Sequence, residues 1–158
     1  MDRLNLLLGI AERRTGNLIE AAVLDACYEQ AVIEFARTAR VDELSLWGSR
    51  GGFDLVIVAV EHLLTGRKAG WVPLEDTLEA IGEVRRRVPT PLLALVTSTE
   101  YEVALLGAGA DVVLPMPFER EILKSEVRKL LRLPEPVGRE EPAGRRLSAA
   151  ALFRGFLG

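Results

Sequence analysis

Short apolar runs alternate with longer amphipathic segments along the first 132 residues of the chain. The runs have the length of buried strands, and the longer segments repeat apolar residues every three or four positions, as helices do. This alternation predicts a parallel sheet that is covered by helices on both faces. The predicted strands are residues 4–8, 31–36, 54–60, 92–96 and 111–114.

The helices between these strands are predicted from apolar spacing and from capping signals. Asn17 and Glu20 have the spacing of a capping box, which predicts that the first helix starts close to residue 17. Short helices are predicted over 42–47 and 100–106, and a glycine-rich turn over 48–52 leads into the third strand. The apolar faces predicted for the three longer helices are Leu18, Ala22, Val23 and Ala26; Leu74, Leu78, Ile81 and Val84; and, within 119–132, Ile122, Leu123, Val127, Leu130 and Leu131.

Five strand and helix units in this order predict an α/β fold, specifically a flavodoxin-like doubly wound sheet of five parallel strands. Such sheets bind ligands beyond the carboxyl ends of their strands. Any functional site is therefore expected among residues 9–12, 59–62, 97–99 and 115–118.

The composition changes after residue 133. Residues 1–133 are predicted to form the domain, and the proline- and glycine-containing stretch 134–144 is predicted to be a flexible linker. Residues 145–158 are predicted to be a C-terminal docking segment. Ser148 can cap a short helix there, and the apolar side chains that this helix would present are Leu152, Phe153, Phe156 and Leu157.

Three destinations are open for this segment. It can dock in a groove of a partner protein as a tethered helical peptide. It can instead pack on its own domain or on a second copy of the chain. A membrane surface is the third destination, but so short a helix with few basic residues would bind a membrane weakly.

Composition and charge exclude several classes of protein. The chain is 49% apolar and 27% charged, and its formal net charge of −3 gives no general attraction to nucleic acid or to anionic lipid. Cys27 is the only cysteine, so neither an intrachain disulfide nor a cysteine-based zinc site can form. The sequence shows no secretion signal and no stretch of membrane-spanning length, so a cytoplasmic location is expected.

Three local strings resemble the receiver domain of two-component response regulators. They are Phe53-Asp-Leu-Val-Ile-Val-Ala59, residues 90–98 (TPLLALVTS), and residues 107–118 (GAGADVVLPMPF). The resemblance covers residues 4–132 and implies the fold predicted above. It also implies a cis peptide bond between Met116 and Pro117.

The resemblance also implies that the usual phosphorylation chemistry is missing. Receivers use an acidic pair to help hold magnesium, an aspartate to accept phosphate and a lysine to neutralise it. Those positions fall on Ile10 and Ala11, on Ala59, and on Met116. Only Thr97 matches the family in type, and Glu12 remains as a nearby acid. The chain therefore resembles a degenerate receiver that takes neither phosphate nor magnesium, and no cofactor is expected.

A protein-interaction function is expected for such a domain, independent of phosphorylation. The resemblance implies a recognition surface within residues 100–131, where Tyr101 and Phe118 are candidates, and Trp71 lies in an extended loop over 65–73. The partner is another protein or a second copy that forms a homodimer.

Two alternatives belong to other functional classes. A small-molecule sensor would bind its ligand between Ile10, Ala59 and Met116. A hydrolase would use Ser98 as nucleophile and His62 as base, but no G-x-S-x-G turn surrounds Ser98. We therefore expect the protein not to be an enzyme.

Overall fold

The computed structural model describes residues 2–63 and 73–134. Trp71, most of the predicted linker and the whole segment 145–158 lie outside the described residues. The strands are β1 (Asp2–Gly9), β2 (Ala31–Thr38), β3 (Leu55–Ala59), β4 (Leu92–Val96) and β5 (Val112–Pro115). The helices are α1 (Arg13–Ala26), α2 (Val41–Arg50), α3 (Leu74–Arg87), α4 (Glu102–Ala108) and α5 (Arg120–Leu130), with 3-10 turns at Val60–His62 and Thr99–Tyr101.

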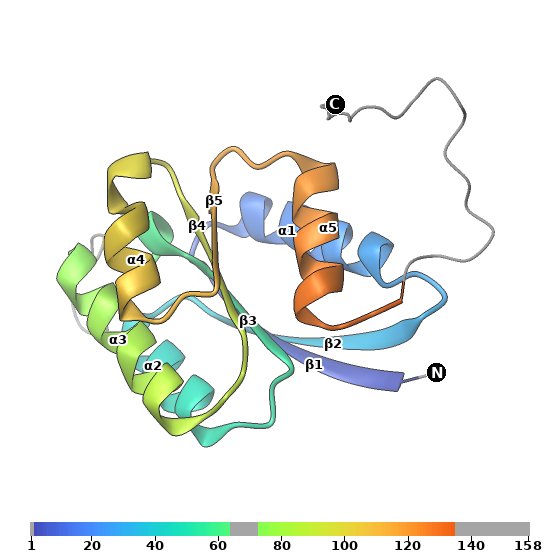
Figure 1. Cartoon of the computed structure of the whole chain (residues 1–158), viewed down its shortest axis with the longest axis horizontal. Helices are drawn as coiled ribbons and strands as arrows, with labels where there is room; N and C mark the ends of the chain where they lie inside the picture. The colour runs from blue at the N-terminus through green and yellow to red at the C-terminus, as the bar shows by residue number, and fades with distance from the viewer. Residues whose placement is uncertain (1, 64–72, 135–158) are drawn as a thin grey trace.

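The five strands form one parallel sheet in the order β2-β1-β3-β4-β5 (Figure 1). This order confirms the flavodoxin-like prediction. Every residue of β3 and β4 is buried, because both faces of these central strands are covered by helices. Their sequences are accordingly uninterrupted apolar runs.

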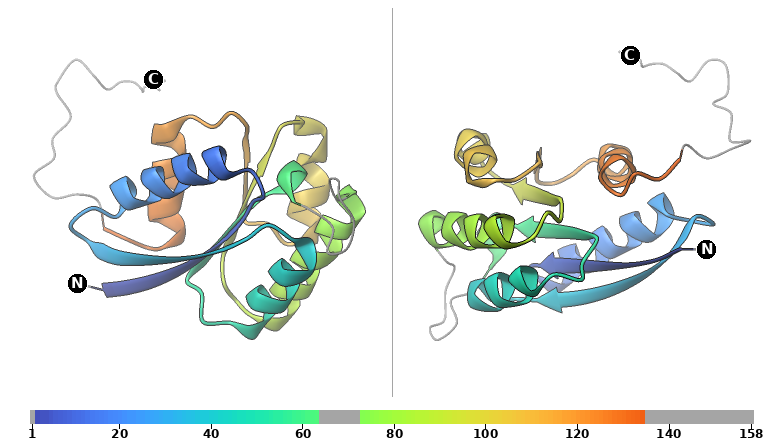
Figure 2. Two further views of the ribbon diagram at one scale, coloured as in Figure 1. Left: turned by 180° about the vertical axis from the view of Figure 1, so that it is seen from behind. Right: turned by 60° about the horizontal axis from the view of Figure 1, so that its bottom comes forward.

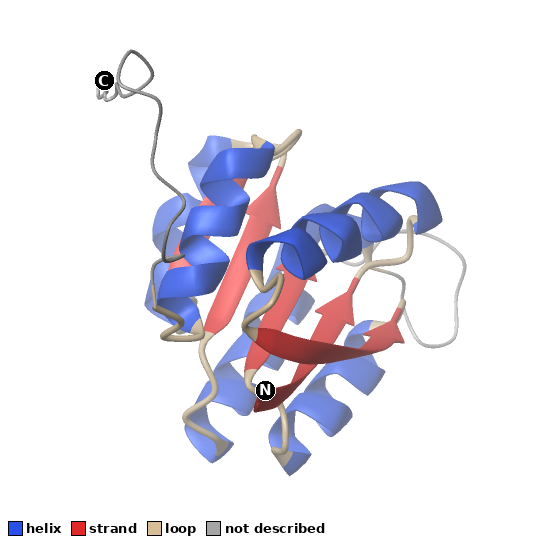
Figure 3. Ribbon diagram, turned by 90° about the vertical axis from the view of Figure 1, so that its right-hand side faces the viewer, coloured by secondary structure: helices blue, strands red, loops and turns tan. Residues whose placement is uncertain are grey.

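The helices lie in two layers on opposite faces of the sheet (Figures 2 and 3). Helices α1 and α5 pack together on one face, and α2, α3 and α4 pack on the other. Alternation along β1 divides the core accordingly: Leu6 and Leu8 belong to the cluster under α1 and α5, and Leu7 belongs to the cluster on the other side.

The predicted start of α1 was wrong. The helix begins at Arg13, and the Glu12 carboxylate caps it by accepting a hydrogen bond from the backbone N–H of Thr15 at 2.6 Å. With this start, the face that meets the sheet carries Ile19 and Val23, and Leu18 is 53% exposed.

The supposed capping-box residues have another role. Asn17 and Glu20 lie inside α1, and both accept hydrogen bonds from Arg37 of β2. They therefore fasten α1 to the edge strand and do not start the helix.

Two further predictions are corrected at helix ends. Helix α2 continues through Gly48 to Arg50, and the turn is made by Gly51 and Gly52, whose φ angles of 82° and 90° are those that glycine adopts without strain. In α5, Ile122 is 44% exposed, because the buried face is formed by Leu123, Lys124 and Val127.

Candidate functional site

The carboxyl ends of the strands bring the predicted site residues to one edge of the sheet. The Met116–Pro117 peptide bond at the end of β5 is cis, as the resemblance implied. The backbone N–H of Met116 donates to the carbonyl of Val96 at 2.7 Å, which joins the ends of β5 and β4. A backbone hydrogen bond therefore fixes the ends of β4 and β5 relative to each other, independently of the side chains.

Hydrocarbon fills the part of this edge where charged groups were expected from a receiver. Ile10 is 2% exposed and Ala59 is fully buried, and Met116 packs against the same core cluster. The neighbouring Ala11 uses its backbone N–H, which donates to the carbonyl of His62 at 2.6 Å. The strand-end residues thus close the core, and the bond from Ala11 joins the segment after β1 to the turn after β3.

Glu12, the acid that remains near β1, is committed to helix capping. The hydrogen bonds from Thr15 hold the pKa of Glu12 below its ordinary value. Because capping uses the ionised carboxylate, this side chain supports α1 and leaves the strand edge without an available acid at that point.

A second carboxylate, that of Glu61, bridges the ends of β3 and β4. One of its oxygens accepts from the backbone N–H of Thr97 at 2.7 Å. The other accepts from the Thr97 hydroxyl at 2.6 Å and from the backbone N–H of Ser98 at 3.3 Å. We call this arrangement the Glu61 clamp. The sequence placed Glu61 only within the expected site range 59–62, since its partners lie 36 and 37 residues further along the chain.

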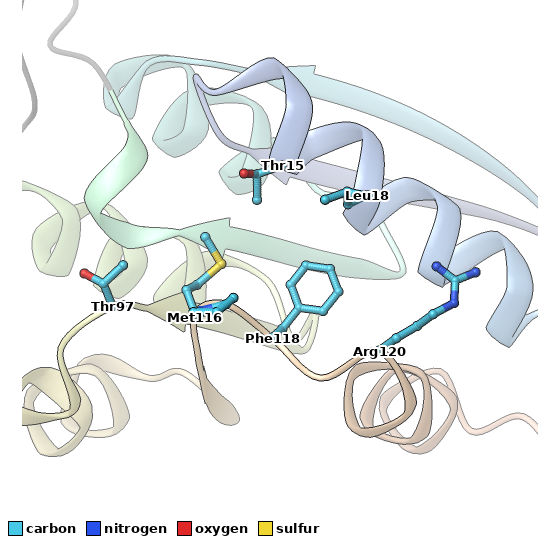
Figure 4. Close-up of a pocket in the computed structure, with 7 residues that line it drawn as sticks. Thr15, Leu18, Thr97, Met116, Phe118 and Arg120 are labelled. Atoms are coloured by element: carbon cyan, nitrogen blue, oxygen red, sulfur yellow. The ribbon is translucent and has the colours of Figure 1, made fainter.

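A cavity of about 400 Å³ opens beside this clamp, between α1 and the loop from β5 to α5 (Figure 4). Its walls are mainly apolar, with Thr97 at one end. Its lining residues are Thr15, Leu18, Thr97, Met116, Pro117, Phe118 and Arg120.

The cavity does not lie where the ligand-sensor alternative placed a binding site. That alternative required Ile10 and Ala59 to contact the ligand, but both are buried in the core and neither lines the cavity. Of the three residues named for it, only Met116 does so.

The hydrolase alternative paired Ser98 with His62 as its base. In the structure the Ser98 hydroxyl donates its proton to a carboxylate oxygen of Glu100 at 3.0 Å, so the hydrogen bond that the structure gives this hydroxyl is to Glu100.

Within 2–63 and 73–134, no group of three or more His, Cys, Asp or Glu side chains is placed to hold a metal ion. None of the helices in that part of the chain is long and apolar enough to cross a membrane.

The two predicted recognition residues that the structure describes are partly buried. Tyr101 packs against the core cluster beneath α3, and Phe118 packs against the cluster beneath α1. More accessible apolar side chains lie on α4, where Val103 is 81% exposed and Leu106 is 45% exposed. Sequence reasoning missed this pair, although their separation of three residues on a short helix was the available signal.

Comparisons with known proteins place the fold firmly. No family model matches the chain, and no curated protein matches it. Many solved structures do match. A protein named as a response regulator from Chloroflexus aurantiacus superposes with a TM-score of 0.64 at 21% identity, covering 83% of this chain and 99% of that one.

Two other matches illustrate the range of proteins with this fold. The receiver domain of a sensor histidine kinase from Pseudomonas aeruginosa, solved with a magnesium ion in its active-site cleft, matches with a TM-score of 0.63 at 18% identity, covering 82% of this chain and 98% of that one. A protein named for pilus assembly from Burkholderia thailandensis matches with a TM-score of 0.59 at 19% identity, covering 84% and 99%. The chain therefore has the receiver fold.

Proposed function

We propose that this protein is a signalling or regulatory module that binds another protein, is not an enzyme, and acts without being phosphorylated. The observation that carries the proposal is the Glu61 clamp beside a buried Ala59. The methyl group of Ala59 stands where the resemblance to receivers expects the phosphate acceptor, and the carboxylate of Glu61, two residues further along, already accepts three hydrogen bonds.

Chemistry at this edge supports the same conclusion. Phosphoryl transfer to a carboxylate needs an oxygen that can attack phosphorus, and it needs cationic groups that neutralise the transferred charge. The two oxygens of Glu61 already accept three hydrogen bonds. Ile10 and Met116 offer neither a magnesium ligand nor a positive charge at the positions where receivers have them.

The Glu61 clamp also supports a recognition function that is always available and needs no phosphate. A receiver that is switched by phosphate has two conformations, and the phosphoryl group biases their equilibrium. Here a resident carboxylate binds the hydroxyl of Thr97, the residue type that contacts the phosphoryl group in receivers. We infer that the Glu61 clamp holds this end of β4 in one conformation without phosphate.

The proposed recognition surface is the face formed by α4, β5 and α5. Val103 and Leu106 are exposed on α4 and give this surface apolar contacts that a partner, or a second copy of the chain, can cover. The fold is shared with a protein named for pilus assembly as well as with response regulators. A shared fold does not identify the partner.

The absence of phosphorylation is tested by intact-mass measurement after incubation with acetyl phosphate and magnesium. We expect no added phosphoryl group, while a conventional receiver that is treated in parallel gains one. A phosphoryl adduct on this chain would overturn the proposal. Its loss in Glu61→Gln would then identify Glu61 as the acceptor.

The recognition surface is tested with Val103→Arg. We expect this variant to lose a binding partner, or the dimer in sedimentation equilibrium, that the unaltered chain retains. Leu46→Arg is the matched control, because Leu46 is also an exposed apolar residue on a helix but lies on α2. Equal loss in both variants, or loss in neither, would contradict the assignment of this face.

A further inference from the structure

We propose that the cavity between α1 and the β5–α5 loop receives the C-terminal segment of the same chain, residues 145–158, through its apolar side chains. The proposal goes beyond the interaction function above, because it names an occupant for a site which that function does not use. When it is docked, the segment hides its apolar side chains until a partner competes for them.

The cavity has the size and chemistry of a small apolar binding site. Its volume of about 400 Å³ lies within the range of pockets that enclose small ligands. Met116 and Phe118 rise from the loop toward α1, and Leu18 extends from α1 into the same space (Figure 4). Leu18 is 53% exposed, so its side chain gains burial when the cavity is filled.

Residues 145–158 have the complementary pattern. Leu152 and Phe153 are followed by Phe156 and Leu157, a spacing that puts these side chains on one face of a helix. Two leucines and two phenylalanines so close together form an apolar patch that is unfavourable to leave in water. An apolar helix face and an apolar groove are the two halves of a common recognition mode.

The stretch of chain between Pro134 and the apolar residues of the C-terminal segment is long enough to reach the cavity. The described chain ends at Pro134, whose carbonyl accepts a hydrogen bond from the Gln30 side chain at 2.8 Å, just beyond the C-terminal end of α1. The cavity lies near the N-terminal ends of α1 and α5. Helix α5 has 11 residues, so its two ends are about 16 Å apart. The 17 residues from 135 to 151 can reach at most about 56–61 Å, which exceeds this distance several-fold.

Charge favours the encounter as well. The formal net charge of the chain is −3, and residues 145–158 contain three arginines and no acidic side chain, so residues 1–144 carry −6. Glu119 and Glu121 flank the cavity-lining Arg120 in the sequence, and Glu121 pairs with Lys124. Arg120 lines the cavity but pairs with Asp25. Net attraction raises the encounter rate, and the apolar contacts hold the segment in place.

Disulfide trapping in the full chain tests the proposal. Leu18→Cys is combined with Ala151→Cys, which leaves the four apolar residues of the segment unchanged. Leu46→Cys with Ala151→Cys is the control, since Leu46 is also 53% exposed but lies on α2, on the opposite face of the sheet. Cys27 is 1% exposed and does not compete. We expect intramolecular crosslinking to be at least about tenfold faster in the Leu18 pair, because docking raises the effective concentration.

A second measurement uses the two methionines of the chain. Met116 lines the cavity and Met1 lies at the N-terminus, so a methionine-methyl NMR spectrum contains one reporter and one reference. We expect Phe153→Ser with Phe156→Ser to shift the Met116 signal and leave the Met1 signal in place. Equal crosslinking rates in the two cysteine pairs together with an unmoved Met116 signal would overturn the proposal.

A third result would also overturn it as stated. Crosslinked dimers whose yield rises with protein concentration would assign the segment to the cavity of a second copy, not to its own domain. None of these outcomes depends on the acetyl phosphate test or on the Val103→Arg test. Failure of the docking proposal is therefore distinguishable from failure of the proposed function.

Discussion

Asp111 and Leu92 exchange two hydrogen bonds at the start of neighbouring strands. The backbone N–H of Asp111 donates to the carbonyl of Leu92 at 2.8 Å, and the Asp111 carboxylate accepts from the N–H of Leu92, also at 2.8 Å. Asp54 and Asn5 repeat this arrangement between β3 and β1, at 2.7 and 2.8 Å. Asp54 and Asp111, which belong to two of the receiver-like strings, therefore join neighbouring strands where β3 and β5 start. This structural role is separate from phosphate chemistry.

We expect Asp111→Ala to lower the free energy of unfolding by about 1–3 kcal/mol, since it leaves the buried N–H of Leu92 without a partner. Asp111→Asn keeps an oxygen acceptor, so we expect it to lose less than half as much. Urea unfolding monitored by circular dichroism measures both. If the two variants were equally destabilised, the ion pair with Arg85 would matter more than the hydrogen bond.

Gly48 lets α2 approach α3 closely. A Cβ atom at this position would lie 2.7 Å from a methyl group of Val84, which is fully buried. Alanine improves helix propensity, but overpacking a core costs about 1–3 kcal/mol. We therefore expect Gly48→Ala to be destabilising by up to about 2 kcal/mol in thermal or urea unfolding.

Gly82→Ala is the control for this substitution. Gly82 also lies within a helix, and the nearest atom to its added Cβ would be 3.9 Å away. Its replacement should stabilise the protein by about 0.5–1 kcal/mol. Val84→Ala removes the methyl groups that the added Cβ would meet. It should therefore lower the free energy of unfolding by less in the Gly48→Ala variant than in the unaltered chain. Strictly additive effects would show that the two side chains do not meet.

Asp25 links α1 to α5 through Lys124, whose side chain is 9% exposed and whose Nζ lies 2.7 Å from an Asp25 oxygen. The hydrogen bond from Lys124 holds the pKa of Asp25 below its ordinary value. Because the pKa of Asp25 is lower in the folded protein than in the unfolded chain, its ionised form stabilises the fold when the pH is above the unfolded-state pKa, near 4. This stabilisation is lost as the pH falls through the lower folded-state pKa.

We expect Asp25→Asn to lower the free energy of unfolding at pH 7 by about 1–2 kcal/mol and to flatten its dependence on pH below 4. Glu121→Gln is the control, because Glu121 also contacts Lys124 but is 79% exposed; it should change stability by less than about 0.5 kcal/mol. If the free energy of unfolding of Asp25→Asn depended on pH below about 4 as steeply as that of the unaltered chain, Asp25 would not be the source of this pH dependence.

Cys27 should be unreactive in the folded protein. Burial raises the pKa of its thiol to about 11, and the residue is 1% exposed. Because only the thiolate attacks, we expect an aromatic disulfide reagent at pH 8 to react at least about a hundredfold more slowly with the native chain than with the chain in urea. A rapid reaction in native buffer would show that the end of α1 opens readily.

The sequence predicted the sheet well because buried strands leave a local signature. The runs Leu55–Ala59 and Leu92–Val96 are apolar at every position since both faces are covered, and the structure places each as a central strand. The start of α1 was mispredicted for an equally local reason. Glu12 and Asn17 can both cap a helix. In the structure Glu12 accepts the capping hydrogen bond from Thr15, and Asn17 lies inside α1, where it accepts a hydrogen bond from Arg37 of β2.

The sequence by itself determined the order of elements and most of the inward positions on the three longer helices, with Leu18 and Ile122 as the exceptions, because these features follow from neighbours within a few positions. Its resemblance to receivers also led to the prediction that Ala59 and Met116 stand where receivers have the phosphate acceptor and the lysine. Only the tertiary structure decided that Glu61 binds Thr97 and that Leu18 faces Phe118 across a cavity. Those relationships join residues 36 and 100 positions apart, and parallel crossovers bring such residues together through packing of the whole domain, which no local pattern encodes.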